Sequence, residues 1–101
     1  MLMMVQFEAF DTIVGERAID SLRKGVAKQI EAISKSGKLK GGGIYASKRG
    51  GFLLLEIKEG KEMLELLGAP LIDHFRIETM PLISFEQLGE FFKEHPIHSH
   101  A

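Results

Sequence analysis

The sequence predicts a single α+β domain in which a four-stranded antiparallel sheet carries two helices on one of its faces. Stretches that alternate apolar and polar residues, as half-buried strands do, are interleaved with stretches whose apolar residues recur every three or four positions, as in amphipathic helices. Glycine and proline separate these stretches, where turns and helix ends are expected. A length of 101 residues suits one domain with one core.

The first two elements are predicted from a change of period. Residues 2–10, LMMVQFEAF, alternate with a period of two and predict a strand. From Glu16 to Lys35 the period lengthens, which predicts a helix that ends near Gly37. Its apolar stripe consists of Ile19, Leu22, Val26, Ile30 and Ile33.

The middle of the chain predicts a hairpin and a short helix. The segments GGGIYAS and GFLLLEI, joined by KRGG, are typical of two strands whose turn uses Gly50 or Gly51 at positive φ. A helix is then expected from about Lys61 to Leu67, closed by Gly68 and Pro70.

The last part of the chain predicts a strand and a capped helix. Residues 74–82, HFRIETMPL, alternate again and predict the fourth strand. Ser84 with Gln87 three residues later is a capping-box pattern for a final helix through Lys93. We therefore predict one domain over residues 1–94 and a mobile tail over residues 95–101.

The resulting order, strand-helix-strand-strand-helix-strand plus a C-terminal helix, is the ferredoxin-like arrangement. Alternation then assigns the two faces of the sheet. The residues expected to face the helices are Val5, Phe7, Leu53, Leu55, Ile57, Phe75 and Ile77. Those expected on the other face are Met4, Gln6, Glu8, Tyr45, Phe52, Leu54, Glu56, Arg76 and Glu78. This second face is too apolar for water and too charged for an ordinary core, so we expect something to cover it.

Composition and charge narrow the function classes. A net charge of -1 gives no basic excess for nucleic-acid phosphates, so no nucleic-acid partner is expected. No apolar run approaches the roughly 20 residues of a membrane span, and the N-terminus lacks signal-peptide features, which predicts a cytoplasmic protein without a membrane partner. With no cysteine, thiolate catalysis and cysteine-ligated metals are excluded.

Two further patterns are considered and set aside. The stretch GKLKGGG suggests a phosphate-binding loop, but such a loop leads into a helix and this one leads into a strand. His95, His98 and His100 lack the rigid spacing of a metal site, so a mobile tail is the preferred interpretation and no cofactor or metal is expected.

Two short motifs carry a resemblance to a known superfamily. A Leu-rich helix ends in Gly68-Ala69-Pro70, and the following strand closes with Glu78-Thr79-Met80-Pro81. Together with the opening MLMMVQFE and the hairpin KGGGIYASKRGGFLLLEI, they make the chain resemble the dimeric α/β-barrel superfamily. Within it the chain is similar to the muconolactone-isomerase-like group and to a related small family of unassigned function.

The resemblance implies that two sheets pack face to face in a homodimer or higher homo-oligomer. Arg76 and Glu78 would then point into the barrel, near Gln6 and Glu8, and we expect Arg76 to pair with Glu8 or Glu78 because an isolated interior charge is costly. Such barrels often hold a small hydrophobic or anionic molecule. Phe85, Phe91 and Phe92 of the last helix are expected to pack against the partner or the end of its barrel.

The candidate site follows from these placements. Glu8 and Glu78 are the candidate catalytic residues, one of which would accept a proton in the isomerisation of a small lactone or carboxylate. Arg76 would bind the anion. Tyr45, Gln6 and His74 complete the candidate ligand-binding residues.

Several alternatives stay open at this level. The charged residues can equally form a structural ion-pair network that fixes sheet and dimer geometry. The same cavity can serve a non-catalytic ligand-binding or sensing module, or be filled by side chains in a structural assembly unit. Relatives that degrade haem or oxygenate quinones also belong to the superfamily.

Overall fold

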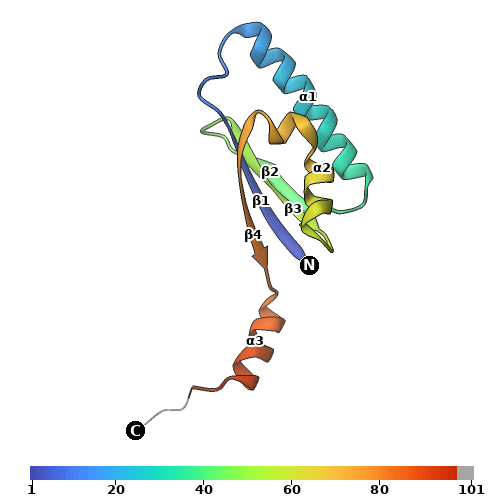
Figure 1. Cartoon of the computed structure of the whole chain (residues 1–101). Coiled ribbons are helices and arrows are strands. Elements are labelled where there is room, and N and C mark those ends of the chain that lie inside the picture. The colour runs from blue at the N-terminus through green and yellow to red at the C-terminus, as the bar shows by residue number, and fades with distance from the viewer. Residues whose placement is uncertain (98–101) are drawn as a thin grey trace.

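A computed structural model describes residues 1–97, which form an α+β structure of four strands and three helices (Figure 1). In chain order the elements are β1 (Leu2–Ala9), α1 (Glu16–Lys35), β2 (Leu39–Ile44), β3 (Gly50–Glu56), α2 (Gly60–Ile72), β4 (Phe75–Leu82) and α3 (Phe85–Glu94). The strands form one open sheet in the order β2-β3-β1-β4, and all neighbours are antiparallel. This topology is compatible with the predicted ferredoxin-like arrangement.

The core lies between one face of the sheet and the helices α1 and α2. The helices contribute Ile33, Leu67 and Leu71, all almost fully buried. Of the seven strand positions predicted to face the helices, six are buried and Ile77 is half-buried against the core. Alternation along the strands was therefore enough to identify the core face.

The helix α1 begins and ends where its spacing predicts. It runs from Glu16 to Lys35, and Gly37 follows in the left-handed region at φ 77°. A residue without a Cβ adopts this conformation at no steric cost, so the chain can leave the helix there.

The prediction that Gly50 or Gly51 supplies a positive φ in the hairpin turn is wrong. Both residues lie within β3, both are buried, and neither has a positive φ. Glycine is needed there for space, since a Cβ would come within 2.3 Å of the carbonyl oxygen of Phe7 or of Gly43 on the neighbouring strands. The positive φ in this region belongs to Gly42 of β2.

The helix α2 is longer than predicted because it resumes after an interruption. Gly68 has φ 69° and ψ 170°, which breaks the helix at the expected place. Two residues later Pro70 stands at the start of a further turn that continues to Ile72. Proline fits the first turn of a helix, so Pro70 opens this second piece. The prediction that Pro70 helps to end the helix is therefore wrong.

The helix α3 begins with the predicted capping box and lies apart from the sheet. The Ser84 hydroxyl accepts from the Gln87 N–H at 3.0 Å, and the Gln87 side chain accepts from the Ser84 N–H at 2.9 Å. Figure 1 shows α3 beyond the end of β4, away from the sheet and from α1 and α2. Its aromatic residues Phe85, Phe91 and Phe92 are exposed.

No helix in the described part of the chain combines the length and apolar character needed to cross a membrane.

Candidate functional site

The face of the sheet opposite the helices has an apolar half and a charged half. Its register places Met4 between Leu54 and Met80, whereas two positions further along β1 Gln6 stands between Phe52 and Glu78. The next residue on this face, Glu8, stands opposite Arg76. No described helix packs on this face, so its side chains remain partly or fully exposed.

The charged half forms a hollow of about 220 Å³. It brings together five of the six predicted site residues, which come from β1, from β4 and from the segment after β2. Its lining consists of Gln6, Phe7, Glu8, Tyr45, Lys48, Arg76 and Glu78. The alternation of β1 and β4 accounts for this convergence, because side chains two positions apart share a face and directly opposed residues lie about 5 Å apart.

Within this hollow the Glu8 carboxylate is paired with Lys48. Its Oε2 lies 3.4 Å from the Lys48 Nζ, and about half of each side chain is exposed. The same Nζ lies 5.2 Å from the centre of the Tyr45 ring, within the range of a cation–π contact. One cation thus joins a candidate catalytic carboxylate to a candidate ligand-binding tyrosine.

Arg76 is the cation of the hollow that has no carboxylate partner in the described chain. It stands directly opposite Glu8 in the β1–β4 register, but neither Glu8 nor Glu78 comes within 4.0 Å of its guanidinium. In the single chain the expected ion pair of Arg76 with Glu8 or Glu78 is therefore not formed. Glu8 pairs with Lys48 instead, and Arg76 is exposed to solvent.

Sequence reasoning missed Lys48, which it treated as part of the turn between β2 and β3. The signal lies in the register: Gly50 pairs with Glu8, and the Ala9 N–H donates to the Arg49 carbonyl oxygen at 2.8 Å. The turn residues just before Gly50 must therefore pass the end of β1. The Lys48 side chain, two positions before Gly50, therefore lies within reach of Glu8.

His74 lies outside the hollow. It follows α2, its side chain is exposed, and its Nδ1 lies 3.2 Å from the Pro70 carbonyl oxygen. It lines a separate surface depression between α1 and the end of α2. The structure therefore does not bring His74 together with the other five candidates.

The C-terminal histidines are described only in part. The His95 ring stacks on Phe91 with centres 4.5 Å apart, and its Nδ1 lies 3.2 Å from the Phe91 carbonyl oxygen. His98 and His100, with residues 98–101 of the predicted mobile tail, lie outside the described residues. Among residues 1–97 no group of three or more acidic or histidine side chains is arranged to hold a metal ion.

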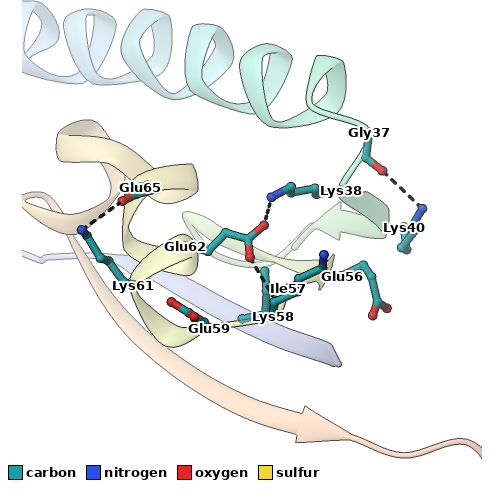
Figure 2. Close-up of a pocket in the computed structure, with 10 residues that line it drawn as sticks. All are labelled: Gly37, Lys38, Lys40, Glu56, Ile57, Lys58, Glu59, Lys61, Glu62 and Glu65. Atoms are coloured by element: carbon teal, nitrogen blue, oxygen red, sulfur yellow. Dashed lines mark hydrogen bonds and ion pairs between the residues drawn. The ribbon is translucent and has the colours of Figure 1, made fainter.

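A second depression, of about 660 Å³, lies where α2 begins (Figure 2). Two ion pairs form among the charged residues that line it. Glu62 pairs with Lys38 and also accepts from the Lys58 N–H at 3.0 Å, while Lys61 lies 3.9 Å from Glu65. Four lysines and four glutamates line it, and Glu62 of α2 joins the segments before β2 and after β3, so we interpret the depression as a structural contact between these segments.

A comparison of the chain with protein-family models gives no match, and a comparison with curated proteins gives none.

Proposed function

We propose that this chain is a small-molecule-binding protein whose site is the hollow around Arg76, completed by a second copy packed against the same sheet face. The observation that carries the proposal is the guanidinium of Arg76, which has no carboxylate partner among residues 1–97 and lies among polar side chains from separate strands. An arginine presents its donors in a planar fork that matches a carboxylate. A small anionic or lactone-type molecule therefore suits this hollow, as the resemblance to the muconolactone-isomerase-like group also suggests.

The apolar half of the face supports assembly through a second copy. Met4, Phe52, Leu54 and Leu82 are only half-buried and Met80 is 39% exposed. Packing two such faces together would remove this apolar surface from water and turn each hollow into part of an enclosed cavity. The exposed aromatic residues of α3 would be covered by the same assembly.

For an enzymatic role, Glu78 is the better placed of the two carboxylates. Glu8 is engaged by Lys48, whereas Glu78 has no ion pair among the described residues. Glu78 would take a proton from one carbon of a substrate held by Arg76 and return it at another. Such an isomerisation balances without a co-reactant. Glu8 would hold Lys48 and Tyr45 in place, and Gln6 would contact the ligand.

The test of binding is a thermal-shift screen of the purified protein with lactones, aromatic and aliphatic carboxylates, quinones and haem. A ligand at about 100 times its dissociation constant stabilises the folded state by about 2.7 kcal/mol, which the screen detects. A carboxylate or lactone hit that is lost in Arg76→Ala and kept in Arg17→Ala, an exposed arginine of α1, supports the site. A hit of equal size in both variants overturns it.

The test of catalysis uses the same hit in deuterated water. Proton transfer would exchange a carbon-bound hydrogen of the ligand for deuterium, which NMR follows directly. Glu78→Gln should stop the exchange and keep binding. If the wild-type protein binds without exchange or turnover, the proton-transfer step is refuted and the site belongs to a non-catalytic binding or sensing protein.

The assembly is tested by light scattering at micromolar concentration. The wild type should give at least twice the 11.3 kDa of one chain. Leu54→Lys, which places a charge on the apolar half of the sheet face, should give a single chain. Leu64→Lys changes an exposed leucine of α2 and should leave assembly intact. A wild-type mass of one chain overturns the homodimer.

A further inference from the structure

A groove on the helix side of the sheet is separate from the hollow described above. It lies between α1 and the strands and has a volume of about 290 Å³. Its walls include Leu22 and Val26 of α1 and Phe7 and Phe75 of the sheet, and almost all of its lining is apolar. A volume near 300 Å³ is at the lower end of the range for small-molecule pockets.

The groove continues along α1 into a second space of about 300 Å³, and the two share Ile30 and Ile44. The reason for the space is the composition of β2. Gly42 pairs with Leu53, which faces the helices, so Gly42 is on the same face and offers no side chain to α1. Accordingly Ile33 is the buried residue of α1, while the rest of its apolar stripe stays half-exposed.

Two arginines line the first space. Arg23 comes from α1 and Arg49 from the segment before β3. Neither guanidinium has a carboxylate within 4.0 Å among residues 1–97; Asp20, one turn before Arg23, is paired with Lys24 at 3.0 Å. The Arg49 Nη1 donates one hydrogen bond to the Ile13 carbonyl oxygen at 3.1 Å, which leaves its other donors available.

We propose that this groove binds an amphiphilic anion, with its alkyl tail along α1 and its carboxylate at Arg23 and Arg49. The apolar walls would remove the tail from water, and the two guanidiniums would provide charge-assisted hydrogen bonds to the head group. An uncharged hydrocarbon would contact the apolar walls but not the guanidiniums. A short carboxylate would contact the guanidiniums but leave the apolar walls unfilled. The site is independent of Arg76 and of the proposed function.

The test titrates the full chain with decanoate below its micellar concentration and follows backbone amide NMR shifts. Shifts should map to α1, β2 and the segment around Arg49. Decanol, which keeps the tail, and acetate, which keeps the charge, should each bind about tenfold more weakly or worse. Equal binding of decanol and decanoate, or no saturable shift with decanoate, overturns the proposal.

Variants separate this groove from other sources of binding. Arg23→Gln should weaken decanoate about tenfold, and Ala27→Leu, which fills the groove from α1, should block it. Arg17→Gln removes the same charge from the same helix outside the groove and should leave binding unchanged. Equal loss in Arg17→Gln and Arg23→Gln would indicate general attraction of anions and would overturn the proposal.

Two other occupants of the groove would also be revealed. If a second copy of the chain fills it, decanoate affinity will fall as protein concentration rises. If the surface adsorbs to lipid, the protein will sediment with phosphatidylglycerol vesicles whether or not it carries Ala27→Leu. Either result contradicts a site for a free amphiphile.

Discussion

The Gln29 side-chain amide donates a hydrogen bond of 2.6 Å to the carbonyl oxygen of Leu66, and this bond ties α1 to α2 where α2 is interrupted. In an unbroken helix the Leu66 oxygen would accept from the N–H of residue 70. Residue 70 is Pro70, which has no N–H. Gln29 therefore supplies the donor that the sequence of α2 lacks.

The first prediction concerns this bond. Gln29→Met keeps the side-chain size but leaves the part-buried Leu66 oxygen without its donor, so the free energy of unfolding should fall by about 1–2 kcal/mol. Urea denaturation measures the change. Lys28→Met, at the neighbouring exposed position, should shift it by less than about 0.5 kcal/mol. Equal values for the two variants would show that the bond does not contribute.

The second prediction concerns Gly68. Its φ of 69° and ψ of 170° belong to a region that only glycine adopts readily, and a Cβ there would meet the Gln29 side chain at 2.9 Å. Gly68→Ala should lower the free energy of unfolding by about 1–3 kcal/mol. Gly60→Ala, at an open position of the same helix, serves as the control in the same denaturation series. A Gly68→Ala protein as stable as the wild type would contradict this conformation.

The third prediction concerns the cap of α3. Ser84→Ala removes the acceptor for the Gln87 N–H and should destabilise this helix by about 1 kcal/mol. Hydrogen exchange should speed up for α3 amides and stay unchanged in β1 and β3, because the helix lies apart from the sheet. Ser47→Ala, in the exposed turn between β2 and β3, should leave hydrogen exchange unchanged both in α3 and in the sheet. Faster exchange throughout the sheet would mean that α3 is coupled to the core.

The fourth prediction separates architecture from binding at Arg76. Because its guanidinium has no carboxylate partner in the described chain, Arg76→Ala should change the stability of the dissociated chain by less than about 0.5 kcal/mol. Lys48→Ala removes an exposed pair and should cost no more than about 1 kcal/mol. Thermal denaturation of dilute protein, with Leu54→Lys as background, is the measurement. A large loss in Arg76→Ala would favour the structural ion-pair network.

Local patterns predicted much of the fold because they report which side of an element is buried. The spacing of apolar residues gave the bounds of α1, alternation gave the core face of the sheet, and Ser84 with Gln87 gave the start of α3. The role of Gly50 and Gly51 was not predictable in the same way. A glycine required by a neighbouring strand looks, within its own segment, like a turn glycine.

The candidate site was predictable to the extent that it depends on sheet register. Gln6, Glu8, Arg76 and Glu78 converge because β1 and β4 are neighbours whose even-numbered residues share a face. Pairing within the site depends on side chains from loops, so Lys48 rather than Arg76 became the partner of Glu8. His74 follows the end of α2, which sequence reasoning placed several residues too early.

The separation of α3 from the rest of the chain makes its helicity a gauge of association. A ten-residue helix that lies apart from the sheet and the other helices is only marginally stable in water, so in a single chain α3 depends on its capping box. If a second copy covers Phe85, Phe91 and Phe92, burial of these rings adds to the stability of the helix. The helical signal per residue in far-ultraviolet circular dichroism would then become stronger as the protein concentration rises. The midpoint of that titration would give the dissociation constant between copies without any label.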